Sequence, residues 1–345
     1  MVNKTLILIV AAWSFLWSPM VRASVTGLCD SCHVMHFSQV GLAPTELTAL
    51  GPQDYLLNNT CLGCHNGINT GAANAVPMVY TAGVMELAGG NFKYSDVTNQ
   101  RNGHNPKELP GGADDTVTTP PGWTTGFNAN GQVGTIDATN QLGCAGTLGC
   151  HGEHNDTGIF GAHHNHPTDA VHGKEATGAT IGTSYRFLYQ IKGYEDADYE
   201  AETANNHNVY YGVARGSDAP TDTQTMSYLC AECHGIFHSG ASVTDGVAGA
   251  IFASPWIRHP VDISMSNTGE YSGYNYLTAA PVASATLTEA QHSTATTSVS
   301  GAGNRIVMCL SCHRAHASPY FASMRWDYRG AAGYLGCAKC HTSKD

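Results

Sequence analysis

Hydrophobic residues are scattered along most of this 345-residue chain without a regular period. No segment repeats them every 3.6 residues, as an amphipathic helix would, and no row of segments alternates apolar and polar side chains, as half-buried strands would. Glycine accounts for 39 of the 345 residues, about 11%, compared with the usual ~7%. Thr, Asn, Ala and Gly dominate long stretches of the chain. The pattern predicts a chain of mostly coil and loops with short helices, which a side-chain core alone would not hold together.

A continuous apolar run stands near the N-terminus, at residues 5–17. Lys4 precedes the run, and Val21–Ala23 fits a small-residue cleavage site. The run is shorter than the roughly 20 residues that span a bilayer, and no such stretch follows it. We therefore predict a signal peptide over residues 1–23 and one exported domain over residues 24–345 without a transmembrane segment. An uncleaved N-terminal anchor is the alternative.

The chain is acidic, with a formal net charge of −11, and removal of Lys4 and Arg22 with the signal peptide takes the count to −13. Nucleic acids and anionic lipid surfaces both attract basic proteins. The charge therefore argues against both as partners.

All 12 cysteines fall into six pairs, and a histidine directly follows the second cysteine of each pair. Five pairs form C-x-x-C-H, the attachment motif of c-type haem, in which two thiols bond the vinyl groups and the next imidazole binds iron. The five motifs are Cys29, Cys32 and His33; Cys61, Cys64 and His65; Cys230, Cys233 and His234; Cys309, Cys312 and His313; and Cys337, Cys340 and His341. Five such motifs behind a signal peptide predict a multihaem c-type cytochrome whose haems form its core.

The remaining pair is longer, because five residues separate Cys144 from Cys150 before His151 follows. Two glycines in this loop would let it bulge outward while both thiols reach the vinyl groups. We expect a sixth haem here, with His151 as its proximal ligand, because no other cysteine is left unpaired. A disulfide or a free thiol pair is the alternative.

Other uses of paired cysteines fit this chain less well. Zinc sites use two C-x-x-C units for each metal, or add a distant pair of histidines, and neither explains a histidine after every second cysteine. Exported disulfide scaffolds are usually much shorter than this chain.

The histidines outnumber the proximal positions, since six of the 18 are proximal and twelve remain for six distal sites. This surplus predicts two histidine ligands for each iron, which then transfers electrons without an open site for a substrate. His36, His154, His238 and His316 follow a proximal ligand by three or four residues. On one helical turn such side chains lie side by side, so the second imidazole must serve a different haem. A surface or propionate-bonding role is the alternative for each.

Further distal candidates lie away from the motifs. His104 and His259 stand in extended segments that a following proline stiffens. The histidine-rich loop after the longer motif, which includes His163 and His164, is expected to supply one ligand. His207 is equally compatible with a ligand and with a surface residue.

Several segments resemble, in order along the chain, the hexahaem outer-surface cytochromes of metal-reducing bacteria, the OmcS-type cytochromes. The most specific segment is CLSCHRAHAS at Cys309–Ser318. The others are CDSCHVMH at Cys29–His36, GHNP at Gly103–Pro106, SYRFL at Ser184–Leu188, MSYLCAECHGIFH at Met226–His238, IRHP at Ile257–Pro260, and Cys337–His341.

The resemblance implies two histidine ligands for every haem, a mostly coiled fold, and protomers that polymerise into filaments with a continuous haem stack. It also implies that His36 crosses the subunit interface to the next protomer's fifth haem, the one that Cys309, Cys312 and His313 hold. The chain departs from the family pattern over residues 144–172, where the family has an ordinary C-x-x-C-H motif. The distal ligand of the third haem therefore stays open.

We therefore expect an electron-transfer protein rather than an enzyme, with six covalently bound haems c, secreted to the extracellular space or the outer cell surface. Its expected partners are copies of itself and other redox proteins or extracellular acceptors. A monomeric periplasmic shuttle is one alternative, since His36 would look the same if it bound a haem of its own chain. A multihaem reductase with one open haem is another, and the lack of any C-x-x-C-K sequence counts against it.

Overall fold

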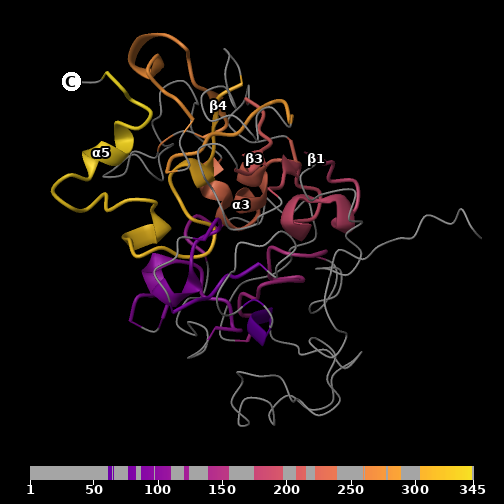
Figure 1. The fold of residues 1–345 in the computed structure, drawn as a ribbon. Coiled ribbons are helices and arrows are strands. Elements are labelled where there is room, and N and C mark those ends of the chain that lie inside the picture. Colours follow the sequence, from indigo (N-terminus) through magenta and orange to yellow (C-terminus); the bar gives the residue numbers. More distant parts are fainter. Residues whose placement is uncertain are drawn as a thin grey trace, which may run out of the picture.

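Elements of secondary structure are short and sparse within the residues that the structure describes (Figure 1). The computed structural model describes residues 61–63, 65, 77–82, 87–96, 98–109, 120–123, 139–154, 175–196, 207–214, 222–238, 259, 261–276, 279–288 and 304–343. Outside them lie the predicted signal peptide, the first motif with His36, Cys64, His163 and His164. Within them, no helix has both the length and the hydrophobicity that crossing a bilayer requires.

The helices of the described ranges gather at the cysteine motifs. α3 (Met226–His234) carries the fourth motif and begins after Thr225, whose hydroxyl accepts a backbone hydrogen bond from the first turn and so caps the helix. α5 (Tyr334–Cys337) leads into the sixth motif. Single turns of 3-10 helix at Cys61–Gly63 and Cys309–Ser311 open the second and fifth motifs. The fold is thus mostly coil with short helices, as the sequence predicted.

Further single 3-10 turns punctuate the connecting segments. They are Phe92–Tyr94, Gln100–Asn102, Ile181–Thr183, Tyr185–Phe187, Gly235–His238, Gly269–Tyr271 and Phe321–Ser323.

Within the described ranges, two small antiparallel sheets join distant segments of the chain. The first has the order β1-β2-β3, formed by Glu175–Ala176, Gly193–Tyr194 and Val209–Tyr210. The second pairs β4 (Ile263–Ser264) with β5 (Ile306–Val307), which brings two segments far apart in the sequence side by side just before the fifth motif. Because each strand has only two residues, the sheets act as local clamps rather than as a layer.

Two distant parts of the chain also pair beside the fifth motif. Gly103 forms a bridge with Ala317, and the N–H of His104 donates to the carbonyl of His316 at 3.0 Å. A Cβ at Gly103 would lie 2.4 Å from the carbonyl oxygen of His316, so only glycine permits this approach. The pairing places two predicted distal histidines next to each other in the structure.

Apolar side chains form three separate clusters in the described ranges, and each borders a cysteine motif. The largest joins the first sheet to α3 and the fifth motif, and consists of Ala176, Tyr185, Leu188, Ile191, Tyr210, Met226, Leu229, Ala283, Ile306, Met308 and Leu310. The second, packed against Cys340, contains Met265, Tyr274, Tyr276, Val282 and Val307. The third, at the second motif, contains Leu62, Phe92, Leu109 and Ala317. The small cores therefore position the motifs directly.

Candidate haem-attachment sites

A backbone hydrogen bond between the histidine and the first cysteine closes four of the described motifs. The histidine N–H donates to the carbonyl of that cysteine at 3.0 to 3.1 Å in four motifs, which are the pairs His65–Cys61, His151–Cys144, His313–Cys309 and His341–Cys337. In the fourth motif, α3 spans Cys230 to His234. The bond places the imidazole beside both cysteines, as attachment of one haem requires.

The longer third motif reaches the same closure through a folded loop. The Cys144 carbonyl accepts from the N–H groups of both Cys150, at 3.2 Å, and His151, at 3.0 Å. Gly146 turns the chain with a φ of +81°, and Gly149 lies so close to Ala145 that a Cβ would be 2.5 Å from its backbone. The extra residues therefore form a loop outside the unit, and Cys144 and His151 keep the backbone relation of an ordinary motif.

The His151 imidazole is oriented by the tight turn at Tyr185–Phe187. Its Nδ1 lies 2.8 Å from the carbonyl oxygen of Arg186, and the N–H of Gly152 donates to the carbonyl of Phe187 at 2.7 Å. Arg186 and Phe187 have φ values of 52° and 56°, a left-handed conformation that residues other than glycine rarely adopt. Such strain persists where the surrounding contacts require it, and here those contacts hold an imidazole.

The fifth motif repeats this arrangement with different residues. Nδ1 of His313 lies 2.8 Å from the carbonyl oxygen of Ala322, and the N–H of Arg314 donates to the carbonyl of Ser323 at 2.7 Å. Ala322 and Ser323 have φ values of 58° and 55°. Two motifs, one ordinary and one longer, thus share one support for their histidine.

The other described proximal histidines also have an acceptor at Nδ1. His65 contacts the carbonyl oxygen of Pro77 and His234 that of Pro121, both at 2.6 Å. His341 instead contacts a carboxylate oxygen of Glu270 at 2.9 Å. Because a carbonyl or a carboxylate oxygen only accepts, Nδ1 carries the proton and Nε2 keeps the lone pair that a metal binds.

Three proximal rings face a second imidazole at the separation that a shared metal would give. The ring centroids lie 6.1 Å apart for His234 and His104, 6.4 Å for His151 and His316, and 6.2 Å for His341 and His259. Two imidazoles bonded through Nε2 at about 2 Å on opposite sides of one metal have centroids about 6.3 Å apart. At three motifs, both imidazoles of a pair would therefore be able to bind one haem iron.

Nδ1 of two of these facing histidines is hydrogen-bonded in the same manner. His104 contacts the carbonyl oxygen of Ala315 at 2.7 Å, and His316 contacts that of Gly90 at 3.4 Å. Burial, more than the nearby His151, lowers the pKa of His316 to about 3. The imidazole is therefore neutral at physiological pH, the form in which histidine binds a metal.

The remaining described candidates are buried or lie on short turns. His154 has no exposed surface, and its Nδ1 lies 3.4 Å from the carboxylate of Glu232, inside the fourth motif. His207 is fully buried and stacks on Tyr276 with ring centroids 3.9 Å apart, so it is not a surface residue. His238 ends the 3-10 turn after α3, and its side chain lies outside the described part.

The sulfur atoms of consecutive motifs lie next to one another. The pKa of the Cys144 thiol is raised, first by a hydrogen bond with Cys61 and second by burial. The pKa of the Cys230 thiol is raised in the same way, first by a hydrogen bond with Cys309. Burial first, and then the thiol of Cys150, raises the pKa of Cys233.

The fifth and sixth motifs are linked in the same way. Burial and then the Cys340 thiol raise the pKa of Cys312 to about 12. Thiol hydrogen bonds therefore join the second motif to the third and the fourth to the fifth, and electrostatic effects between thiols act from the third motif to the fourth and from the sixth to the fifth.

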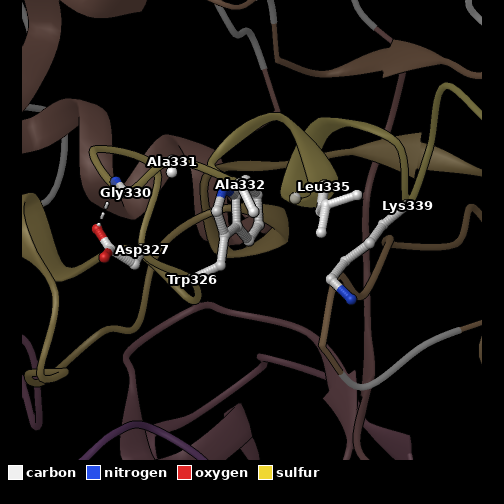
Figure 2. Close-up of a pocket in the computed structure, with 8 residues that line it drawn as sticks. Trp326, Asp327, Gly330, Ala331, Ala332, Leu335 and Lys339 are labelled. Carbon is white, nitrogen blue, oxygen red and sulfur yellow. Dashed lines mark hydrogen bonds between the residues drawn. The ribbon is translucent and has the colours of Figure 1, made fainter.

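A shallow hollow of about 460 Å³ borders the sixth motif (Figure 2). Its lining consists of Trp326, Asp327, Gly330, Ala331, Ala332, Leu335, Gly336 and Lys339. The carboxylate of Asp327 accepts a hydrogen bond from the N–H of Gly330 at 3.0 Å and closes the turn that forms one wall. A Cβ at Gly336 would lie 1.9 Å from the indole of Trp326, so glycine lets α5 rest on this ring just before Cys337.

The cysteines of the described ranges, which include Cys144 and Cys150, form no disulfide. No three His, Cys, Asp or Glu side chains among the described residues gather as a metal-ion site.

Sequence reasoning missed the groups that hold the proximal imidazoles. The acceptors at Pro77, Pro121, Arg186, Ala322 and Glu270 lie between 9 and 113 residues from the histidines that they contact. Four of the five are backbone carbonyls, which carry no mark in the sequence. The SYRFL segment, which contains Arg186, is part of the family resemblance, but the sequence predicted no function for it.

The comparisons with known proteins agree with the motifs. Residues 303–345 match the family model of a doubled CXXCH motif, which covers the fifth and sixth units. The C-type cytochrome OmcS of Geobacter sulfurreducens is 27% identical over an alignment of 365 positions, which covers 87% of this chain and 78% of the relative.

Two solved structures are also similar to this chain. The Outer Membrane Cytochrome S filament from Geobacter sulfurreducens has 21% identity and a TM-score of 0.48, with 93% of this chain and 100% of that chain covered. The cryo-EM structure of the OmcS nanowires from the same organism has 24% identity and a TM-score of 0.46, with 88% and 84% covered. The motifs and the OmcS relative together support covalently bound haem c. The resemblance predicted from the motifs is therefore confirmed: over most of its length this chain is similar in sequence to the c-type cytochrome OmcS.

Proposed function

We propose that this chain is an electron-transfer protein, not an enzyme, that carries six covalently bound haems c, each with two histidine ligands. The observation that carries this proposal is the set of three facing imidazole pairs, with centroids 6.1 to 6.4 Å apart. Each pair joins a motif histidine to a histidine from a distant segment. Haem bound there would supply reversible one-electron chemistry, and two histidine ligands leave the iron no site for a substrate.

The facing pairs support a proposed distal ligand for each of three haems. His316 serves the third haem opposite His151, His104 serves the fourth opposite His234, and His259 serves the sixth opposite His341. His316 thus binds a haem other than that of His313, as its three-residue offset requires. The first, second and fifth haems take their distal ligands from His36, His154, His207, His238 and the loop with His163 and His164.

The third motif binds haem in spite of its longer spacing. Two features support this: the closing hydrogen bond from His151 to Cys144, and the turn at Arg186 that supports the imidazole as Ala322 does at the fifth motif.

The chain holds its haems close together, in the order of the motifs. The neighbouring sulfur atoms of consecutive motifs support this, since each thioether lies at the edge of its porphyrin. Short gaps between haems allow electrons to pass from one to the next without a carrier.

The protein acts outside the cell, where protomers polymerise into a conductive filament that delivers electrons to external acceptors. The similarity to OmcS over 87% of the chain supports this, together with the predicted signal peptide at residues 1–23 and the CDSCHVMH segment. His36 crosses the interface and binds the next protomer's fifth haem.

Intact mass and electron paramagnetic resonance of the mature holoprotein test the core of this proposal. We expect a mass that fits six haems and a spectrum of the oxidised protein without a high-spin ferric signal. A mass that fits five haems and a disulfide would contradict the proposal that Cys144 and Cys150 bind a haem. A substantial high-spin signal with rapid carbon monoxide binding would favour a reductase with an open haem.

Substitution of His316 tests the assignment of ligands. His316→Ala should retain six haems but convert one haem in six to the high-spin form, because Nε2 is lost from the face opposite His151. His292→Ala, in a Thr/Ser-rich segment without a predicted ligand role, should leave all haems low-spin. Unchanged low-spin signals in both variants would overturn the assignment of His316.

A further inference from the structure

The sixth motif differs from the other described motifs in the group that holds its proximal imidazole. His65, His151, His234 and His313 each contact a neutral backbone carbonyl at Nδ1. His341 contacts the carboxylate of Glu270 at 2.9 Å. The difference is one of charge, since the distances all lie between 2.6 and 2.9 Å.

Glu270 is held in place by contacts on both its backbone and its side chain. Its carbonyl accepts from the N–H of Thr342 at 2.7 Å and from the hydroxyl of Thr342 at 2.8 Å. That hydroxyl also accepts from the N–H of Gly273 at 3.1 Å, which closes the turn that follows Glu270. The ring of Tyr271 lies 5.1 Å from the ring of His341. The residue directly after His341 thus clamps the loop that brings the carboxylate to it.

A carboxylate acceptor changes the donor strength of the imidazole. It draws the Nδ1 proton more strongly than a carbonyl does, so the ring gains imidazolate character and becomes a stronger base toward iron. Stronger donation and a nearby negative charge both stabilise ferric over ferrous iron, which lowers the reduction potential. The side chains of His341 and Glu270 are 21% and 31% exposed, so solvent weakens the effect of the charge without removing the hydrogen bond.

We propose that Glu270 is a positioning residue that acts through His341 and lowers the reduction potential of the haem at Cys337 and Cys340. The inference rests on the proposed function, because it requires haem at the sixth motif. It implies that the reduction potentials of the haems differ along the series. The haem at the sixth motif would lose its electron more readily with Glu270 at Nδ1 of His341 than with a backbone carbonyl at that position.

Glu270→Gln removes the charge and keeps an oxygen that accepts from Nδ1. In a redox titration of the holoprotein, a component of one sixth of the amplitude should move to higher potential. One low-spin component of the paramagnetic resonance spectrum should change its g values as the imidazolate character falls. Glu175→Gln, at an exposed position on β1, is the matched control and should change neither readout.

The outcomes separate this inference from the proposed function. A peptide map of the wild type without haem on Cys337 and Cys340 would defeat both, whereas a missing haem at Cys144 and Cys150 would count against the proposed haem number alone. Six low-spin haems with the same titration curve and g values in Glu270→Gln as in the wild type would overturn the role of Glu270 alone. If Glu270→Gln yields too little holoprotein, Glu270→Asp is the alternative variant. It keeps the charge, but its shorter side chain places the carboxylate farther from Nδ1 of His341. It should then move the same component in the same direction by less, and an unchanged curve would again contradict the proposal.

Discussion

Hydrogen bonds at Nδ1 prepare the described proximal histidines of this protein for iron. The acceptor fixes the tautomer and the ring orientation, and leaves Nε2 as the ligand. At Arg186 and Ala322 the chain adopts a left-handed backbone to present the carbonyl, although neither residue is glycine. The cost of such a conformation, of order 1–3 kcal/mol, indicates how strongly the surrounding contacts determine these two turns.

A buried carboxylate lies next to one of these turns and should make stability depend on pH. Glu195 is 1% exposed, burial raises its pKa, and its side chain accepts a hydrogen bond from the N–H of Arg186. An acid with a raised pKa in the folded state binds its proton more tightly there than in the unfolded chain. Its contribution to stability is therefore present at low pH and is lost as pH rises above the unfolded value of 4.5.

Glu195→Gln removes this ionisation and keeps an oxygen for Arg186. Between pH 4.5 and pH 8 the melting temperature of the variant should rise relative to that of the wild type. The corresponding difference in the free energy of unfolding is about 1.4 kcal/mol for each unit by which folding shifts the pKa of Glu195. Circular dichroism melts over this range measure it, with Glu175→Gln as the exposed control. A constant difference between variant and wild type across the range would contradict the expectation.

One of the six attachment motifs, the third, differs from the others in the number of residues between its cysteines. An ordinary motif uses one helical turn to set two thiols and an imidazole side by side. The third motif replaces the turn with a loop, yet its His151 N–H bonds the Cys144 carbonyl at 3.0 Å, as in the second and sixth motifs. What the site retains is therefore the closing hydrogen bond, and the number of residues between the cysteines can change.

Gly149→Ala tests the importance of this closure. The new Cβ would lie 2.5 Å from the backbone of Ala145, so the loop cannot fold back onto Cys144. We expect a mature protein whose intact mass shows five haems in most molecules. Gly143→Ala is the matched control, since its Cβ would lie 3.1 Å from the end of the flexible Glu108 side chain and at ordinary contact distance, 3.5 and 3.6 Å, from Lys107 and Ala145. Six haems in both variants would show that attachment does not need the folded loop.

The described part of the molecule is organised around its motifs rather than around a layered core. Three apolar clusters of described residues each border a motif, and two-residue strands clamp distant segments beside them. The pairing of Gly103 with Ala317 brings His104 and His316 together from opposite ends of the sequence. Their ring partners, His234 and His151, belong to two different motifs, so this one junction serves two predicted haems.

His36 is the residue on which the proposed polymer depends. His36→Ala should leave six haems in each chain, abolish or weaken filaments, and convert one haem in six to the high-spin form, because the proposed bond between subunits is a metal–imidazole bond. Negative-stain microscopy and size-exclusion chromatography of the secreted protein measure assembly. His316→Ala, which loses an internal ligand, should still form filaments. Normal filaments with every iron low-spin in His36→Ala would remove the support for a continuous wire.

The sequence alone predicted the attachment chemistry because that chemistry is local. Two thiols and one imidazole must lie within one short segment to hold a haem, so each of the six units is visible in the sequence. The offset of His316 from His313 likewise excludes a shared haem by helix geometry alone. The coiled fold followed from the missing periodicity, and the resemblance to OmcS from the segments around the motifs.

The tertiary structure decided which histidines face each other and what holds them. His104 contacts Ala315, 211 residues away, and His341 contacts Glu270, 71 residues away. Such pairs are made by irregular loops, whose paths no sequence period describes. His207 was equally compatible with the surface and with a ligand, and only the packing against Tyr276 shows that it is buried. Covalent attachment is fixed by neighbours along the chain, whereas the opposite axial position and the support of each imidazole come from segments that meet only when the chain folds.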